Sequence, residues 1–164
     1  ANGPSRYLRS KGRGEALVQQ SGLDYTIFQP SVILGRGDSF LNLFAKLARV
    51  APVLPLGGAE AQFQPVWVED VARCFIRALD HKTSYQQSYP LCGPQRYSLR
   101  QLVHYTASLG GCPRPIFALP DGLARLQAGL LELLPGQLMS RDNLDSMSVA
   151  STCAPTAWWS SLEA

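Results

Sequence analysis

Residues 7–37 read YLRSKGRGEALVQQSGLDYTIFQPSVILGRG, and this stretch decides the fold. Its first part predicts a helix over residues 7–20, because Gly22 then stands where helices commonly end in a left-handed conformation. A β-branched and aromatic run follows, which predicts a strand over residues 24–29, closed by Pro30. The run is too apolar for a half-exposed strand, so we expect a parallel strand that is buried on both faces. A helix followed by such a strand is the second part of a βαβ unit.

The rest of the chain alternates between shorter helices and strands. Further helices are expected after Asp38 or Ser39, after Glu69 and Asp70, after a capping box formed by Ser98 and Gln101, and over residues 121–134 and 140–145. Strands are expected over residues 64–68, 89–92 and 116–119. The apolar spacing predicts that one helix buries Val71, Phe75, Ile76 and Leu79, and that the capped helix buries Leu99, Leu102, Val103, Thr106 and Leu109.

This alternation predicts an α/β class with few strands. One strong strand and three short ones compare with roughly 5–6 strands in an average sheet. A strand buried like residues 24–29 needs a neighbour on each side, and the sequence offers a partner on one side only, residues 89–92. We therefore expect one edge of the strand to be free.

Composition narrows the classes of protein. With 164 residues, the chain suits one domain or a piece of a larger one. A content of 46% hydrophobic and 16% charged residues is that of a folded protein. The net charge of +3 comes from scattered basic residues, which argues against a nucleic-acid platform because such a platform needs a basic stripe.

The cysteines and histidines suggest neither a metal site nor an oxidising compartment. The four cysteines, Cys74, Cys92, Cys112 and Cys153, lie far apart, and we expect them to be reduced residues of a cytoplasmic protein. The two histidines, His81 and His104, lack ligand-spaced partners, so no metal is expected. No apolar run approaches the roughly 20 residues of a transmembrane helix. The chain begins at Ala1 without a methionine, and we expect its N-terminus to be trimmed.

Tyr7 and Lys11 are the first candidates for chemistry. They stand four residues apart, so a helix projects both side chains from one face. A lysine ammonium close to a tyrosine hydroxyl favours the phenolate, and such a tyrosine can give or take a proton at a carbonyl or carbinol. On spacing alone, an exposed pair without function is the commoner interpretation.

The surrounding residues favour the functional interpretation. Tyr7 to Lys11, residues 21–28, and the run Pro30-Ser31-Val32-Ile33-Leu34-Gly35 closely resemble the extended and atypical short-chain dehydrogenase/reductases, the group named for NAD-dependent epimerases and dehydratases. Val66 to Asp70 and Tyr97-Ser98-Leu99 resemble further blocks of this group. The resemblance covers nearly the whole chain in order. The nearest branch includes the NADPH-binding accessory subunit of respiratory complex I.

The resemblance implies a cofactor and roles for particular residues. Tyr7 would be the acid/base residue, and Lys11 would assist it and hold the nicotinamide ribose. Pro30, Ser31 and Val32 would meet the nicotinamide at the carboxyl end of the strand, where ligands of open α/β sheets bind; a plain turn is the alternative there. The substrate side would be walled by Phe40, Phe44 and Phe63. The cofactor would be NAD or NADP, with NADP favoured.

Two departures from the family pattern limit these implications. The glycine-rich phosphate loop of the family is not among the 164 residues, so the cofactor is expected to be bound mainly by residues outside this chain. In sugar-nucleotide epimerases an arginine grips the diphosphate shortly before the Val-x-Asp block, whereas this chain has Phe63 there. An aromatic ring cannot neutralise a phosphate, which argues against a sugar-nucleotide substrate.

We therefore expect the C-terminal part of a Rossmann-like doubly wound sheet in residues 1–95, and a small, mostly helical substrate-side region in residues 96–164. The parent would be a NAD(P)-dependent reductase or epimerase-like enzyme, or alternatively a non-catalytic protein that holds NADPH for assembly or binding. A small-molecule or lipid-like substrate and self-association through the free strand edge are expected, without nucleic acid. The Leu-rich helix over residues 121–134 is interpreted as core rather than membrane-binding, and Trp158-Trp159 as tail packing.

Overall fold

The computed structural model describes residues 3–133 and 139–154. Its helices are α1 (Arg6–Gln19), α2 (Ser39–Val50), α3 (Val68–Asp80), α4 (Leu99–Leu109), α5 (Asp121–Leu131) and α6 (Arg141–Met147), with a 3₁₀ turn η1 (Lys82–Ser84). Its strands are β1 (Thr26–Pro30), β2 (Ile33–Leu34), β3 (Leu54–Leu56), β4 (Gln62–Phe63), β5 (Val66–Trp67), β6 (Gln87–Leu91), β7 (Tyr97–Ser98) and β8 (Ile116–Ala118). The α/β class is confirmed.

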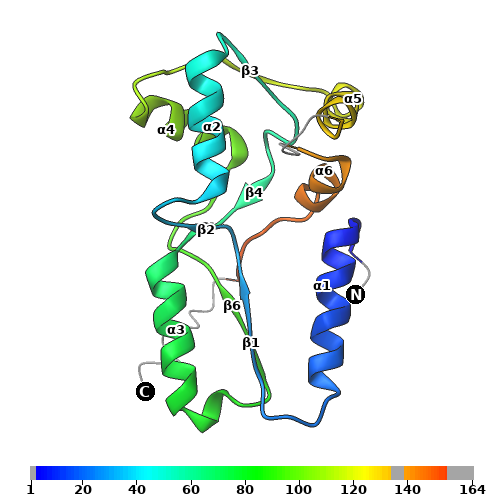
Figure 1. Ribbon diagram of the computed structural model, residues 1–164, viewed down its shortest axis with the longest axis vertical. Coiled ribbons are helices and arrows are strands. Elements are labelled where there is room, and N and C mark those ends of the chain that lie inside the picture. Colours follow the sequence, from blue (N-terminus) through cyan, green and yellow to red (C-terminus); the bar gives the residue numbers. More distant parts are fainter. Residues whose placement is uncertain (1–2, 134–138, 155–164) are drawn as a thin grey trace.

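One half of the molecule is a three-layer unit. β1 and β6 pair in parallel with Thr26 opposite Gln87 and Pro30 opposite Leu91, so the expected partner strand is confirmed. Figure 1 shows this pair between α1 on one side and α3 on the other. Within the described residues β1 pairs only with β6, and its other edge is free.

The other half gathers α2, α4, α5 and α6 around short strands, with β3 pairing with β8 and β4 with β7 (Figure 1). The main core lies here and is formed by Ala48, Leu54, Leu56, Ala59, Phe63, Leu99, Leu102, Val103 and Ala107. These residues come from both sides of position 95, where the two expected regions meet. The division into regions 1–95 and 96–164 stays a prediction.

Helix caps follow the sequence signals closely. Asp38 caps α2 by accepting the backbone N–H of Leu41 at 2.6 Å. Ser98 and Gln101 form the expected capping box of α4, in which the Gln101 side chain accepts the Ser98 N–H at 2.7 Å. Local polar groups of this kind satisfy N–H groups that a helix leaves unpaired, so a few residues of sequence are enough to predict them.

The expectations about burial are wrong in several places. β1 is half-buried at Thr26 and exposed at Gln29 and Pro30, because a single partner strand covers it. α3 buries Val71, Cys74 and Ala78, whereas three residues of its expected buried stripe, Phe75, Ile76 and Leu79, are exposed. A two-stranded sheet is too narrow to cover the whole apolar stripe of this helix. Leu109 is likewise 72% exposed.

Some boundaries also differ. Of the strand expected over residues 64–68, only β5 at Val66–Trp67 forms, and it pairs with β2. The separate short strand β4 precedes the expected range and pairs with β7. α5 ends at Leu131, and α6 continues to Met147. Four large side chains of the Leu-rich segment, those of Leu123, Leu126, Leu130 and Leu133, are exposed rather than core. Trp158 and Trp159 lie outside the described residues.

Candidate functional site

Helix α1 holds the Tyr7 and Lys11 side chains together at its first turns. Ser5 caps the helix by accepting the Leu8 N–H at 3.0 Å. The Lys11 ammonium lies over the Tyr7 ring, with Nζ 5.6 Å from the ring centroid. Tyr7 is 55% exposed. Neither the Tyr7 hydroxyl nor the Lys11 ammonium has a hydrogen-bond or ion-pair partner in residues 3–133 and 139–154, so both are accessible to a ligand.

The start of α1, which carries Tyr7 and Lys11, extends past the carboxyl end of β1. α1 runs antiparallel to β1, so the N-terminal end of the helix points the same way as the carboxyl end of the strand (Figure 1). Gln29, next to the carboxyl end of β1, donates through Nε2 to Glu15 Oε1 at 2.7 Å. Tyr7 precedes Glu15 on α1 by eight residues, about 12 Å of helix, so it lies beyond that end of the strand. The carboxyl end of the parallel pair is where open α/β sheets bind ligands.

Asp142 of α6 anchors the first turn of α1. The backbone N–H of Arg6 donates to Oδ1 at 2.6 Å, and that of Tyr7 donates to Oδ2 at 3.0 Å. The pKa of Asp142 lies below its ordinary 3.8. The hydrogen bond from the Arg6 N–H lowers it most, and the bond from Tyr7 and the charges of Arg9 and Arg6 lower it further, while desolvation opposes them. Ser146 of the same helix donates to the Ser5 hydroxyl at 2.8 Å. Sequence reasoning missed Asp142, since nothing local relates it to residues 135 positions away.

We expect Asp142→Ala to fray the first turn of α1, because two N–H groups lose their acceptor where the positive end of the helix dipole favours a carboxylate. Amide exchange at Arg6 and Tyr7 should accelerate several-fold in hydrogen-exchange NMR, with Asp142→Asn intermediate. In the wild-type protein the pKa is lowered on folding, so the stabilisation is present above about pH 3.8 and is lost as the pH falls through the lowered pKa. If the amide chemical shifts of Arg6 and Tyr7 do not change as the Asp142 carboxylate is protonated, Asp142 does not anchor this turn.

In the turn after β1, polar groups of Ser31 and Val32 already form hydrogen bonds within the chain. The Ser31 N–H donates to the Leu91 carbonyl at 2.9 Å, and the Val66 N–H donates to the Val32 carbonyl at 3.0 Å. The Ser31 hydroxyl donates to the Ser151 carbonyl at 2.6 Å and accepts the Gln64 N–H at 3.2 Å. Ser31 is therefore buried and hydrogen-bonded, while Pro30 is exposed.

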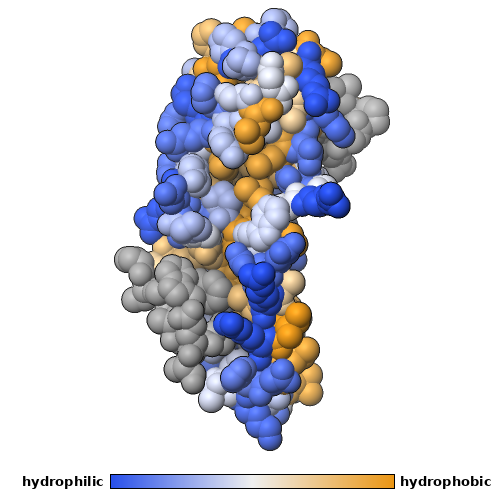
Figure 2. Space-filling model, turned by 90° about the vertical axis from the view of Figure 1, so that its left-hand side faces the viewer, coloured by the Kyte–Doolittle hydropathy of each residue, from blue (hydrophilic) through white to orange (hydrophobic). Residues whose placement is uncertain are grey.

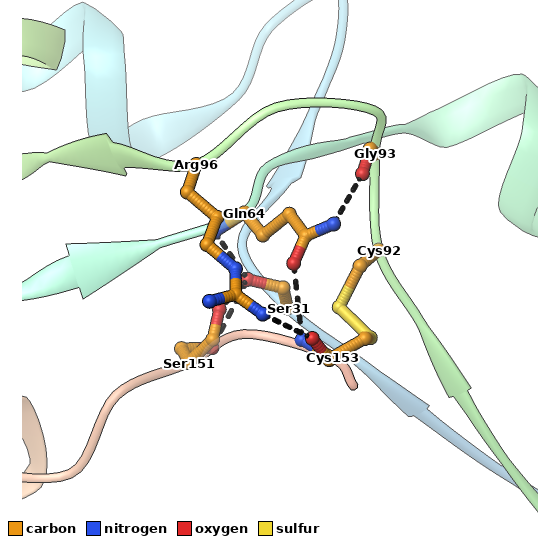
Figure 3. Close-up of a disulfide and its surroundings, with 7 residues drawn as sticks. All are labelled: Ser31, Gln64, Cys92, Gly93, Arg96, Ser151 and Cys153. Carbon is orange, nitrogen blue, oxygen red and sulfur yellow. Dashed lines mark hydrogen bonds between the residues drawn. A yellow bond between two sulfur atoms is a disulfide. The ribbon is translucent and has the colours of Figure 1, made fainter. Parts of the chain in front are cut away.

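A C-terminal strap, residues 151–153, covers this turn (Figure 3). Ser151 donates its N–H to the Gln62 carbonyl at 2.9 Å and accepts that of Gln64 at 3.0 Å. The Cys153 N–H donates to Gln64 Oε1 at 3.0 Å, and Arg96 donates to the Cys153 carbonyl at 2.7 Å. The strap is thus attached to β4 and to the segment after β6.

The strap is also covalently fixed by a disulfide between Cys92 and Cys153, whose Cα atoms are 6.0 Å apart. The expectation that these cysteines are reduced is therefore wrong. A separation of 61 residues with no local motif gave no basis for predicting the pair. Cys74 and Cys112 are free, as expected.

The three candidate substrate-side residues come together away from α1. The rings of Phe40 and Phe44 have centroids 5.4 Å apart, and those of Phe40 and Phe63 are 5.8 Å apart. Phe63 belongs to the main core, and the other two pack against it. In the described ranges, no hydrogen bond or aromatic contact joins this trio to Tyr7 or Lys11.

The described part of the chain shows neither a cluster of metal ligands nor a membrane-spanning helix. Within the described residues, no group of three or more His, Cys, Asp or Glu side chains is arranged to hold a metal ion. No helix in this part of the chain has the length and apolar character needed to cross a membrane.

Comparisons with known proteins agree with this architecture. A profile of the NAD dependent epimerase/dehydratase family matches residues 4–92. A protein of Arabidopsis thaliana, NADH dehydrogenase (ubiquinone) 1 alpha subcomplex subunit 9, mitochondrial, is 36% identical over 102 residues, which make up 61% of this chain and 25% of that protein. The chain spans about a quarter of the length of the curated relatives it matches.

Solved structures show the same fold at low sequence identity. A nucleoside-diphosphate-sugar epimerase from Staphylococcus aureus superposes with a TM-score of 0.64 and 16% identity, covering 90% of this chain and 48% of that one. A dTDP-4-dehydrorhamnose reductase from Bacillus anthracis, in complex with NADP, gives a TM-score of 0.61 with 16% identity, covering 70% of this chain and 40% of that one. The fold is that of part of a Rossmann-like epimerase or reductase.

Proposed function

Because this chain belongs to the NAD-dependent epimerase/dehydratase family, we propose that it supplies the Tyr/Lys side of a NAD(P)-dependent reductase- or epimerase-like active site. The observation that supports this most directly is the placement of Tyr7 and Lys11. They share one helix face, have polar groups free of protein partners in the described part, and lie on the end of α1 that extends past the carboxyl end of the parallel β1–β6 pair. A tyrosine hydroxyl and an ammonium in this position suit a carbonyl oxygen and a ribose hydroxyl.

In this proposal the chain's own residues bind, orient and move a proton. A bound nicotinamide would supply or accept the hydride. The Tyr7 hydroxyl would give its proton to the substrate oxygen during reduction, or take one from a carbinol during oxidation. Lys11 would donate to a ribose hydroxyl and place a positive charge beside Tyr7. Asp142 would hold the first turn of α1, and with it Tyr7, through the N–H groups of Arg6 and Tyr7.

The cofactor would be held jointly. Tyr7, Lys11 and the Pro30–Val32 turn would contribute the nicotinamide end, and residues outside this chain would contribute the phosphates, with NADP favoured over NAD. The bound turn would use Pro30, which is exposed, more readily than the Ser31 hydroxyl, which already bonds to Ser151 and Gln64. Phe40, Phe44 and Phe63 would wall an apolar part of the substrate site.

A second function, non-catalytic retention of NADPH within an assembly, is favoured by the sequence relatives. The 36% identical Arabidopsis protein is named as a subunit of NADH dehydrogenase. The names of such relatives include the word mitochondrial, whereas a cytoplasmic location is what composition predicts for this chain. The location stays a prediction, and the disulfide removes one of its premises.

Cofactor consumption distinguishes the two functions. The full-length protein is loaded with NADPH, a panel of carbonyl compounds is added, and nicotinamide absorbance is followed. An enzyme oxidises its NADPH in the presence of at least one carbonyl compound, whereas a holding protein retains the cofactor unchanged. If the full-length protein binds neither NADPH nor NADH, both functions are wrong.

The 164-residue chain alone should bind the dinucleotide weakly, since the glycine-rich phosphate cradle is not among its residues. Its free β1 edge should also favour pairing with another chain. Titration with NADPH and sedimentation at several protein concentrations test these two points. Micromolar NADPH affinity, or a strictly monomeric chain, would contradict the respective point.

A further inference from the structure

A cleft of about 990 Å³ opens beside α3 and α4, next to the segment that follows β6. Its lining includes residues of α3 and none of α1, and these two helices lie on opposite sides of the β1–β6 pair (Figure 1). Figure 2 views the molecule from the α3 side and shows apolar residues running between hydrophilic ones along the middle of the face. A volume of this size is at the upper end of the range typical of small-molecule sites.

The floor of the cleft is apolar and tightly built. Val66, Leu102 and Cys92 line it and are 3%, 5% and 6% exposed. Gly93 also lines it, and a Cβ at this position would collide with the Pro65 carbonyl oxygen, so a side chain has no room there. Such a floor favours an apolar body over a hydrated one.

The rim of the cleft offers hydrogen-bond donors and a surplus of positive charge. Arg73 is paired with Asp70 at 3.1 Å, whereas Arg77 has no ion-pair or hydrogen-bond partner in the part of the chain that the structure describes. Burial raises the pKa of the Cys74 thiol, and the negative charge of Asp70 raises it further. The positive charge of Arg77 lowers this pKa, so the guanidinium is close enough to influence Cys74 in the wall of the cleft. Two arginines against one aspartate leave one positive charge uncompensated.

Gln101 on α4 adds a further hydrogen-bond donor to the lining of the cleft. Gln101 uses its side-chain oxygen to accept the Ser98 N–H in the capping box, which leaves its amide N–H₂ free of that bond. Trp67 and Tyr105, 49% and 60% exposed, add aromatic surface at the mouth. The lining thus combines an apolar floor, aromatic edges and donors with an unpaired guanidinium.

We propose that this cleft is a second ligand site, which binds an amphipathic monocarboxylate. The apolar body lies on Val66 and Leu102 against Trp67 and Tyr105, and the carboxylate meets Arg77, with Gln101 as a further donor. A polyphosphate fits less well, because only one guanidinium is unpaired and the floor cannot solvate additional charge. A neutral apolar ligand would leave the donor-rich rim without a role. The site is separate from the proposed nicotinamide site.

Calorimetric titration of the complete chain with octanoate and with octan-1-ol tests the proposal, because the two probes share the apolar tail and differ in the charged head. Arg77→Gln should weaken octanoate binding about tenfold or more, in line with the loss of a charge-assisted hydrogen bond. It should change octan-1-ol binding less than twofold. Tyr105→Ala should weaken both probes.

Arg13→Gln is the matched control, since it removes the same charge from the exposed face of α1, outside the cleft. It should leave both affinities within twofold of wild type, and circular dichroism should show all three variants folded. Binding must occur without NADPH, so its outcome is independent of the proposed cofactor function. Absence of saturable octanoate binding, or equal octanoate affinity in the wild type and Arg77→Gln, overturns the proposal.

Discussion

Tyr7→Phe in the full-length protein should lower turnover on its carbonyl substrate by a factor of about 10² to 10⁴, the usual contribution of a positioned acid/base group. The change removes one hydroxyl and keeps the ring beneath the Lys11 ammonium, so the first turn of α1 and its bonds to Asp142 should persist. The affinity for NADPH should change far less than turnover, because Lys11 and the turn after β1 remain. Steady-state kinetics and a cofactor titration measure the two quantities.

Tyr25→Phe is a suitable control for this change. Tyr25 precedes β1 at its amino end, at the opposite end of the strand from Pro30, and its removed hydroxyl has no hydrogen bond in the described ranges. It should retain wild-type turnover. If Tyr7→Phe turns over its substrate as fast as Tyr25→Phe, Tyr7 has no acid/base role, and the NADPH-holding function becomes the better account.

Replacing both Cys92 and Cys153 with Ser should reduce the free energy of unfolding by about 2 to 4 kcal/mol. The disulfide closes a loop of 61 residues in sequence separation, so its loss frees a long segment of the unfolded chain. Denaturant unfolding of the oxidised wild type and the double variant gives the difference. Amide exchange at Ser151 and Gln64 should also accelerate, since their mutual bond lies two residues from Cys153.

Reduction provides the internal control. A dithiol reductant should bring the wild-type protein to the stability of the Cys92→Ser/Cys153→Ser variant, and it should leave that variant unchanged. Cys74 and Cys112 are present in both proteins, so their thiols cannot account for a difference. Equal stability of the oxidised and reduced wild type would show that the strap is held by its hydrogen bonds alone.

The sequence was sufficient where structure depends on neighbours a few residues apart. The α1–β1 succession, the Asp38 cap and the Ser98–Gln101 box follow from local patterns, and β6 as partner of β1 followed from the shortage of other strands. The spacing of Tyr7 and Lys11 likewise placed both on one face. These features need no knowledge of the distant chain.

The remainder depends on contacts between distant segments. The bonds of Asp142 to α1, of Ser151 to Ser31, and the disulfide join positions 61 to 136 residues apart, and no local pattern specifies them. The apolar stripe of α3 shows a different limit. Its spacing predicted a buried face, but the width of the sheet beneath it decides how much of that face is covered, and Phe75, Ile76 and Leu79 remain exposed.

Helix α1 has no buried residue in this structure, and its first turn is secured by side chains of α6. During synthesis the carboxylate that secures α1 leaves the ribosome more than 130 residues after α1 itself. Contacts between such distant segments close late, because the intervening chain must first be ordered. The tyrosine and lysine would therefore reach their working orientation among the last events of maturation, and a nascent chain halted before Asp142 would hold them only loosely.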